Sequence, residues 1–520
     1  MKHYVQGEMK ILKKEWFKVL FRRRVVVSLL IIIQVVFFCY VMMSGSKYSG
    51  LAEICLNIVS LLVSLHIINR KSKNAYKIIW IFLILVFPVF GGMFYLLIVL
   101  QSSTRKMNSD YNNIIRFSEK LYYIPESAEK NHKFECDDKY EKQISYIQNK
   151  AGFPAYKNTS IEYFPLGEEM FSKLLEELKK ATKYIFLEYF IIQEGKMWDS
   201  ILTILIEKAR EGVEVRVMYD DMGCFLLLPK DYADTLRTYN IKCKVFNPFR
   251  PFVEALQNNR DHRKIAIIDG HTAFTGGINL ADEYINEYEK HGHWKDTAVM
   301  LKGEGAWSLT MMFLQLWSLC DGRQENYEDY YEKNDLIVSD GIVQPYCDSP
   351  LDEENVAENI YLHIINSAKE YLYISTPYLI LDESISTALM LSAKSGVDVK
   401  IITPGIWDKR FVHFTTRSYY KELIESGIEV YEYTPGFIHS KVFVSDDAVA
   451  SVGTVNLDYR SLYLHFECGT CIYNADVVND IRKDFTNTLE KCRKIKMEDC
   501  KTNWLIRFFG EIARLFAPLL

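Results

Sequence analysis

Apolar and polar positions divide the chain into an apolar start and a longer remainder of alternating character. Residues 25–43, 51–68 and 78–100 are three successive apolar runs without polar faces. A run of about 20 apolar residues can cross the hydrocarbon core of a bilayer as one helix. The pattern therefore predicts that residues 1–107 form a membrane anchor region, with candidate spans at 25–43, 51–68 and 78–100.

Beyond residue 150 the pattern alternates between helical and extended periods, and it does so twice in the same order. Helix, strand, helix and strand are predicted over residues 168–183, 184–192, 199–211 and 213–219, and again over 356–370, 371–378, 385–395 and 397–403. Strands that alternate with helices indicate a sheet covered on both faces. We expect an α/β fold with two similar α/β/α sandwich halves, related by a pseudo-twofold axis with the site between them.

The expected segment boundaries follow from this repeat. The first half covers residues 108–335, and its polar opening over 108–150 is typical of a linker with a lead-in helix. The second half covers residues 336–495. Residues 496–520 form an amphipathic tail, with its charged residues on one face. Such a tail is typical of a helix lying in the lipid interface, or of a helix docked on a domain.

Charge and cysteine content narrow the class of protein. The formal net charge of −5 argues against a nucleic-acid-binding protein, which needs a basic domain or stripe. Eleven scattered Cys residues favour reduced, buried thiols over a disulfide framework. Nothing in this composition calls for a metal or another cofactor.

Basic residues indicate the orientation in the cell membrane, where we expect a multi-pass protein. They crowd before the first apolar run and in the loop at residues 70–73, which places the N-terminus in the cytoplasm. With three full spans the catalytic part lies outside the cytoplasm. If the second run only lies in the interface, the catalytic part lies inside it, as the unpaired cysteines favour.

One short motif occurs twice at identical spacing. A Lys follows a His by two positions, and an Asp, a Gly and an Asn follow the same His by seven, fourteen and seventeen positions. An internal repeat of this kind is stronger evidence than either copy alone. The two copies consist of His262, Lys264, Asp269, Gly276 and Asn279, and of His439, Lys441, Asp446, Gly453 and Asn456.

The spacing places the polar groups on one surface. Each Lys begins a short apolar run that reads as a buried strand ending in a turn, and side chains two apart on a strand share a face. Two copies face to face would surround one point with two imidazoles, two ammonium groups and two amides. This set suits attack on a phosphodiester: one His is the nucleophile, the other protonates the leaving alcohol, and Lys and Asn hold the phosphoryl oxygens. Asp269 and Asp446 stand at turns, where they fix strand ends.

The two stretches resemble the paired HKD motifs of the phospholipase D superfamily, in which the Asp belongs to the catalytic motif. Flanking segments narrow the resemblance to bacterial cardiolipin synthases, from about Lys73 to the C-terminus. These segments are Tyr219-Asp220-Asp221-Met222-Gly223, Asn259-Arg260-Asp261 and Gly453-Thr454-Val455-Asn456-Leu457-Asp458.

The resemblance also implies a carboxylate that orients each catalytic His through its second ring nitrogen. Glu467 follows the second motif in this role, and Asp296 follows the first. His465 departs from the family pattern, because Asn is usual at that place.

The activity implied is phosphatidyl transfer without a cofactor or metal. One phosphatidylglycerol loads a phosphatidyl group onto a His and releases glycerol, and a second phosphatidylglycerol accepts the group to give cardiolipin. Family precedent assigns His262 as the nucleophile and His439 as the acid and then the base. A phospholipase D using water, a transferase using another alcohol and, less favoured, a nuclease stay open as alternatives.

Overall fold

The computed structural model describes residues 29, 32, 36, 47–99, 102–128, 138–250, 255–333, 337, 339–501 and 503–519. The chain forms two compact units. One comprises residues 1–107 and 249–258, and the other comprises residues 108–248 and 259–520. The second unit contains both copies of the motif.

The first unit is a small group of helices: α3 (Lys47–Ile68), α4 (Asn74–Val86) and α5 (Pro88–Val99). Their shared core is small and is centred on Ile67, Ile84 and Tyr95. A Cβ at Gly91 would lie 2.7 Å from the carbonyl oxygen of Leu83, so glycine permits the close turn between α4 and α5. Many aliphatic side chains of these helices remain exposed.

The expected spans at 51–68 and 78–100 are not borne out as single membrane-crossing helices, since no described helix combines the necessary length and apolar character. Residues 51–68 lie within α3, whose polar positions lower its mean hydropathy. Residues 78–100 are divided at Pro88, because proline cannot continue the hydrogen bonds of the preceding helix. The span expected at 25–43 lies outside the described residues, apart from three isolated positions.

The second unit contains two sheets with the same strand order. The first sheet has the order β1-β9-β7-β6-β2-β3-β4, and β2, β3 and β4 are parallel. Its strands are β1 (Thr159–Phe164), β2 (Tyr184–Tyr189), β3 (Glu214–Asp220), β4 (Lys242–Phe246), β6 (Lys264–Ile268), β7 (Thr272–Gly276) and β9 (Ala298–Gly303).

The second sheet repeats this order as β10-β17-β16-β15-β11-β12-β13, extended by β18 at one edge. Strand for strand the two sheets correspond, which confirms the duplicated α/β fold. The strands are β10 (Ile342–Asp348), β11 (Tyr371–Ser375), β12 (Asp398–Pro404), β13 (Glu429–Tyr433), β15 (Val442–Ser445), β16 (Val449–Gly453), β17 (His465–Tyr473) and β18 (Cys492–Lys494).

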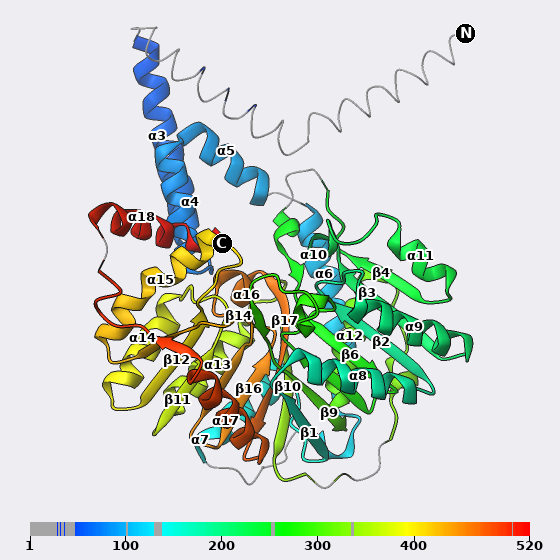
Figure 1. Ribbon diagram of the computed structural model, residues 1–520. Helices are drawn as coiled ribbons and strands as arrows, with labels where there is room; N and C mark the ends of the chain where they lie inside the picture. Colours follow the sequence, from blue (N-terminus) through cyan, green and yellow to red (C-terminus); the bar gives the residue numbers. More distant parts are fainter. Residues whose placement is uncertain are drawn as a thin grey trace, which may run out of the picture. The chain divides into compact units, whose positions relative to one another are not determined.

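Helices cover the sheets of both halves (Figure 1). The first half has α8 (Gly167–Lys180), α9 (Lys196–Arg210), α10 (Asp221–Cys224), α11 (Tyr232–Thr238) and α12 (Ala306–Asp321). The second half has α13 (Val356–Ser367), α14 (Glu383–Lys394), α15 (Arg410–Glu425), α16 (Tyr459–Tyr463), α17 (Val477–Leu489) and α18 (Trp504–Leu515). Helix α12 is buried along nearly its whole length, and its aromatic residues are core, as Phe313 stacked on Phe186 shows.

The segment before β1 is more than the expected linker. It contains α6 (Ser102–Ser118) and α7 (Asp138–Tyr146), and its tyrosines enter the core. The Tyr122 hydroxyl donates to Gln315 of α12 at 3.0 Å, and Tyr140 is fully buried against Tyr473. Buried aromatic anchors of this kind were hidden in a sequence whose average character is polar.

Two short strand pairs join the halves by main-chain hydrogen bonds. Strand β5 (Arg260–Asp261) of the first half pairs with the start of β17 in the second. Strand β14 (Gly436–Ile438) of the second half pairs with β8 (His293–Lys295) in the first. The two pairs are equivalent, because β5 and β14 each directly precede one of the repeated histidines.

Candidate active site

The two motif histidines stand at the same edge of their respective sheets. His262 precedes β6 and His439 precedes β15. Strand β6 runs antiparallel to β2, and β15 runs antiparallel to β11; β2 and β11 belong to the set of parallel strands in each sheet. The histidines therefore lie at the carboxyl ends of the parallel strands, the edge at which α/β sheets commonly bind ligands. Both imidazoles are buried, with 7% of each residue exposed.

Each histidine is oriented by a carboxylate from the other half. His262 Nδ1 lies 2.9 Å from Oε1 of Glu467, and His439 Nδ1 lies 2.6 Å from Oδ2 of Asp296. The backbone N–H of His262 also donates to Phe466 of β17, and that of His439 to Lys295 of β8. The expected carboxylates are thus brought to the histidines, but each serves the histidine of the opposite half.

The motif lysines are almost fully buried and bind backbone rather than acid groups. Lys264 Nζ donates to the carbonyl of His262 at 2.5 Å, and Lys441 Nζ donates to the carbonyl of His439. Within the described residues neither ammonium forms a salt bridge with a carboxylate. Two buried amino groups that form no direct salt bridge with a described carboxylate, beside two imidazoles, favour binding of a small anion.

Burial and the paired charges shift the pKa values of this cluster downward. Burial, then the charges of Lys264 and Lys441, hold the pKa of His262 well below its usual value. Burial and Lys441 lower the pKa of His439 to about 4. Burial also lowers the pKa of Lys264 to about 8 and that of Lys441 to about 7. The charges of His439 and Lys441 contribute to the lowered pKa of His262, so groups of the second copy lie near the histidine of the first.

The motif aspartates lie at the far ends of the motif strands. Asp269 accepts hydrogen bonds from the backbone N–H groups of Thr182, Lys183 and Tyr184 at 2.8 Å. Asp446 accepts three equivalent bonds from residues 369–371 at 2.9–3.0 Å. Both have positive φ angles, 51° and 53°. The structure therefore does not bring either aspartate to the histidines; each ties a turn to the start of a strand.

Asn279 and Asn456 are buried near the return of each hairpin. The amide of Asn279 is engaged: its oxygen accepts from Ile191 N at 3.0 Å and its nitrogen donates to the Tyr284 hydroxyl at 2.7 Å. The side-chain oxygen of Asn456 has no hydrogen-bond partner among the described residues. The two copies are therefore alike in sequence but not in bonding.

Glycine is required where each hairpin approaches its neighbour. A Cβ at Gly276 would lie 2.4 Å from Thr297 O, and a Cβ at Gly453 would lie 2.5 Å from Cys468 O. One residue further, a Cβ at Gly277 would collide with the carboxylate of Asp296. The repeated glycines thus leave room for the strands that carry the orienting carboxylates.

Aromatic rings that sequence reasoning did not single out form the walls around the histidines. Phe190 lies edge-on to His262 at a ring-centroid distance of 5.0 Å. Tyr284 and Trp294 lie 5.6 and 5.5 Å from His439. Low-polarity walls strengthen the electrostatic interactions inside the site. Only the position of Trp294 beside the expected Asp296 offered a signal in the sequence.

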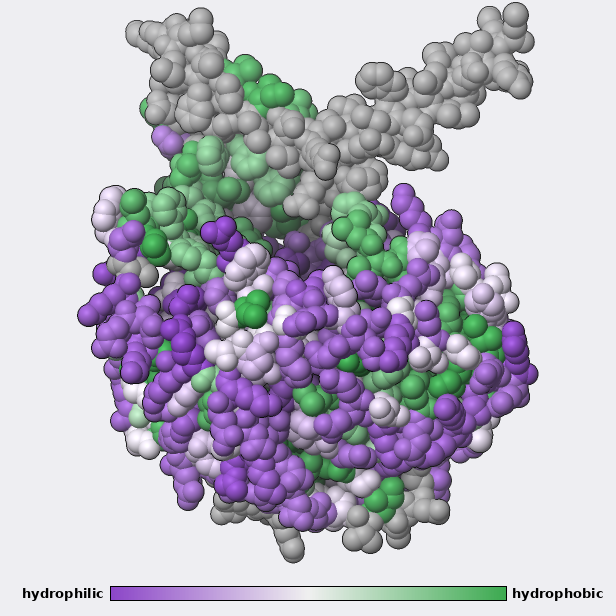
Figure 2. Space-filling model, in the orientation of Figure 1, coloured by the Kyte–Doolittle hydropathy of each residue, from purple (hydrophilic) through white to green (hydrophobic). Residues whose placement is uncertain are grey.

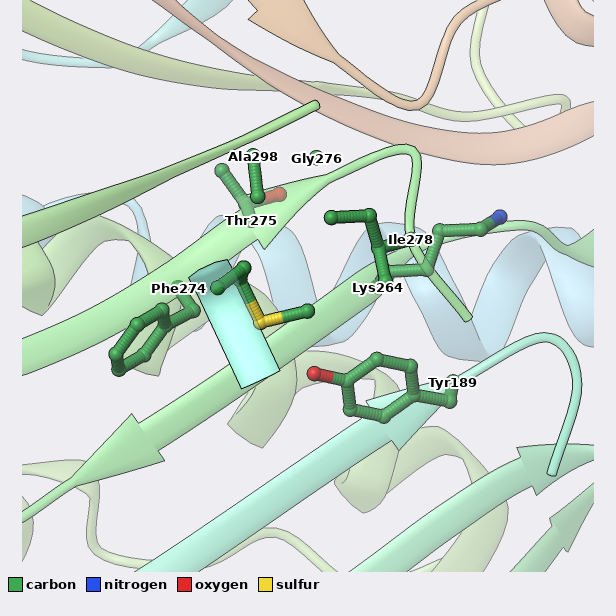
Figure 3. A pocket seen from close by; sticks show the side chains of 8 residues that line it. Tyr189, Lys264, Phe274, Thr275, Gly276, Ile278 and Ala298 are labelled. Carbon is green, nitrogen blue, oxygen red and sulfur yellow. The ribbon is translucent and has the colours of Figure 1, made fainter. Parts of the chain in front are cut away.

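A small cavity lies beneath the first motif (Figure 3). It has a volume of about 10 Å³ and is lined by the stem of Lys264 together with Tyr189, Phe274 and Ile278. This volume admits about one water molecule. The amine end of Lys264 points away from the other lining side chains in Figure 3, and it donates to the carbonyl of His262.

His465 adds a third imidazole beside Glu467. Its Nδ1 lies 3.6 Å from Glu467 Oε1, and Arg460 donates to its Nε2 at 3.3 Å. His262, His465 and Glu467 have the spacing of metal ligands. The bond from Arg460 places the proton of a neutral His465 on Nδ1, the atom facing Glu467, and this protonation opposes metal binding there.

Comparisons with known proteins agree with the duplicated fold. A family described as "Cardiolipin synthase, PLD-like domain" matches residues 174–302 and 361–489, and one described as phospholipase D-nuclease N-terminal matches residues 58–98. Each of the two matches of the first kind covers most of one sheet and leaves out its first strand, β1 or β10.

Relatives match over nearly the full length. An uncharacterised protein of Streptococcus mutans is 46% identical over 88% of this chain and 99% of its own. A cardiolipin synthase of Geobacillus sp. is 33% identical over 96% of this chain and 99% of its own. The crystal structure of a phosphatidylserine synthase from Haemophilus influenzae has a TM-score of 0.54 at 15% identity and covers 69% of this chain and 95% of its own, which shows a shared fold. The chain belongs to the cardiolipin synthase family of the phospholipase D superfamily.

Proposed function

We propose that the protein is a cardiolipin synthase that transfers a phosphatidyl group between two phosphatidylglycerol molecules. The observation that carries this proposal is the crossed pair of histidine–carboxylate contacts beside two buried lysines that lack acidic partners among the described residues. Such a site is complementary to one phosphodiester with a histidine on each side. Relatives named cardiolipin synthase, one third identical over nearly the whole chain, support the substrate.

The first chemical step loads the enzyme. Because Nδ1 of His262 is held by Glu467, Nε2 is the nitrogen that attacks phosphorus. The bond between phosphorus and the glycerol oxygen breaks, and protonated His439 donates its proton to that oxygen as glycerol leaves. Glu467 stabilises the positive charge that develops on the His262 ring, and Asp296 does the same for His439.

The second step releases the product. Neutral His439 takes the proton from a hydroxyl group of a second phosphatidylglycerol, and that oxygen attacks the phosphohistidine. The bond to His262 breaks and cardiolipin forms. Lys264 and Lys441 neutralise the non-bridging oxygens in both steps. We assign a structural role to Asp269 and Asp446, and we assign Asn279 and Asn456 to the support of the site rather than to proton transfer.

Substrate binding prepares the acid. In the free protein both imidazoles are neutral near pH 7, because burial and the lysines depress their pKa values. A bound phosphodiester brings a negative charge that offsets the lysine charges and raises the pKa of the adjacent histidine. Protonation of His439 is therefore coupled to the arrival of substrate.

We further propose that the protein works at the cell membrane. The first unit exposes many aliphatic side chains on α3, α4 and α5, which suits association with lipid. A resident membrane protein meets its lipid substrate at high local concentration. Protease accessibility of the second unit in sealed vesicles would show which side of the membrane carries it.

Product analysis tests the function. Purified full-length protein in phosphatidylglycerol vesicles is expected to form cardiolipin and glycerol in equal amounts, with and without EDTA. His262→Ala serves as the control for contaminating activity. Phosphatidic acid as the main product would identify a phospholipase D, and a mixed product with an added alcohol would identify another transferase. Salt-sensitive cleavage of DNA without lipid turnover would identify a nuclease.

A further inference from the structure

Exposed apolar side chains occupy equivalent loops in the two halves. After β3 the chain turns through α10, where Met222 is 43% exposed, and Leu226 just beyond α10 is 88% exposed. After the corresponding strand β12, Trp407 and Phe411 are about half exposed, at 49% and 51%. Both loops leave the carboxyl ends of parallel strands, which is the edge that carries the histidines. The duplication thus places apolar groups on both sides of the site.

The first loop is built directly onto the site. The Asp220 side chain accepts from the N–H groups of Met222 and Gly223, and its other oxygen accepts from Asp261 N at 3.0 Å. Asp261 immediately precedes His262. A Cβ at Gly223 would lie 2.0 Å from the Phe190 carbonyl, so this turn packs tightly against the residue whose ring contacts His262.

The second loop is held in a similar way. The Tyr378 hydroxyl donates to Asp408 at 2.5 Å, and Lys409 Nζ lies 5.4 Å from the centroid of the Tyr378 ring. The charge of Lys409 contributes to the lowered pKa of His262. This loop follows the carboxyl end of β12, and Trp407, one residue before Asp408, is about half exposed.

Helix α18 extends the apolar surface on the second half. Its inner face carries Gly510 and Ala513, which are buried, and Arg514, which binds Glu422 of α15 at 2.8 Å. Its outer side chains Trp504 and Phe509 are 74% and 57% exposed. Hydrophobic residues gather over α18 in Figure 2. The tail is thus docked on α15 and still exposes apolar side chains, and its placement in a lipid interface stays a prediction.

Two small cavities beside the motif strands bear on where the acyl chains of a bound phospholipid lie. Two cavities lie next to the motif strands, one beside Lys264 and one beside Ser440, and each has a volume of about 10 Å³. Pockets that enclose a drug-sized ligand measure roughly 300 Å³ or more. Neither of these two cavities can take up an acyl chain, which favours a bound phospholipid whose chains stay in the bilayer while its phosphate enters the site.

We propose that the loops around Leu226 and Trp407, together with the outer face of α18, form the surface by which the second unit docks on an anionic phospholipid bilayer. This surface, the docking rim, rests on the proposed function for its lipid substrate. Trp and Phe are favoured at the boundary between headgroups and acyl chains. Lys409 and Arg410 at the start of α15 add positive charge beside Trp407, which suits anionic headgroups. The mouth of the site then faces the headgroup layer.

The test uses full-length protein and a matched control. The double variant Leu226→Ser/Trp407→Ser removes the tips of both loops. Tyr239→Ser/Leu391→Ser removes two similarly exposed apolar side chains that follow α11 and end α14, at the opposite edge of the sheets. Activity is measured on phosphatidylglycerol in vesicles and on a short-chain phosphatidylglycerol dispersed below its micelle concentration.

We expect the rim variant to lose about tenfold or more activity on vesicles and to keep its activity within about twofold on the dispersed substrate. The control variant should keep both activities. Equal losses on the two substrates, or the same loss in the control, would overturn the docking rim.

A second readout does not depend on catalysis. In vesicles with brominated acyl chains the tryptophan fluorescence of the full-length protein is expected to be quenched, and Trp407→Phe should remove part of that quenching. Unchanged quenching in Trp407→Phe would overturn the contact between this loop and lipid. Absence of cardiolipin with quenching intact would instead reject the proposed reaction and leave the docking rim standing.

Discussion

His262 and Glu467 are separated by 205 positions in the chain, yet Nδ1 of the histidine lies 2.9 Å from the carboxylate of the glutamate. Asp296 and His439 form the reciprocal contact at 2.6 Å. Each half of the molecule therefore supplies one histidine and the carboxylate that orients the other. Because each of these two pairs is shared between the halves, the halves must pack together before either imidazole is held in its orientation.

The crossed pairing predicts which variants are coupled. Glu467→Gln should lower kcat by about 10²–10⁴-fold, because the neutral amide no longer fixes the tautomer or stabilises the imidazolium. The double variant His262→Ala/Glu467→Gln should be no worse than His262→Ala alone, since both changes remove the same interaction. The coupling free energy between His262 and Glu467 is obtained from the rates of the two single variants and the double variant on phosphatidylglycerol vesicles.

The matched control is His439→Ala with Asp296→Asn, which should behave in the same way. Coupling within a half, between His262 and Asp296 instead of Glu467, would contradict the crossed arrangement.

Variants of the two histidines should differ in how much covalent phosphatidyl label accumulates on the protein. Replacing either should lower turnover by at least about 10³-fold, because nucleophile and general acid act in the same step. With phosphate-labelled phosphatidylglycerol, His439→Gln should still accumulate some acid-labile label on the protein, because His262 remains. His262→Ala should accumulate none. The reverse pattern would exchange the two roles.

The lysines predict a pH dependence on the alkaline side. The pKa of Lys441 is lowered to about 7 and that of Lys264 to about 8, so both ammonium groups are charged at pH 6 and lose their charge as the pH rises. Anion binding weakens with that loss. We expect kcat/KM to fall between pH 6 and pH 9, mainly through a higher KM.

Lys441→Met tests the origin of this fall. This variant should have a raised KM at all pH values and a flatter profile near pH 7. In the free protein the titration of His439, with a pKa of about 4, lies below this window. A wild-type KM that stays constant from pH 6 to pH 9 would rule out the lysines as its source.

Asp269 and Asp446 should contribute to stability rather than to chemistry. Each accepts at least three backbone hydrogen bonds, and each hydrogen bond to a charged group contributes about 1.5–3 kcal/mol before desolvation of the remaining partners. Asp269→Ala should lower the free energy of unfolding by about 2–4 kcal/mol and reduce Tm. The folded fraction should keep its kcat.

Asp269→Asn is the control for backbone conformation, because Asn tolerates the positive φ at this turn. It should lose less stability than the alanine variant. A loss of kcat by more than about 10²-fold in a fully folded Asp269→Asn protein would show that Asp269 takes part in catalysis.

The sequence alone determined the duplicated fold and most of the residues that we propose for the site. The alternation of strands with helices and the repeated His-Lys spacing depend on local periodicity, which residues carry wherever they fold. For this reason the spacing by itself identifies His262, Lys264, His439 and Lys441. The same local information did not show that Pro88 divides residues 78–100 into two helices, and the average polarity of residues 108–150 concealed buried tyrosines beside the expected helix.

Only the tertiary structure decided how these residues are paired. The partner of His262 depends on the main-chain pairing of β5 with β17, a contact between segments about two hundred residues apart. The pKa shifts depend on how many groups the fold buries at one place, and the separation of Asp269 from His262 depends on the full length of β6. Periodicity reports which face of an element is apolar, but burial and charge–charge energies arise only when distant elements meet.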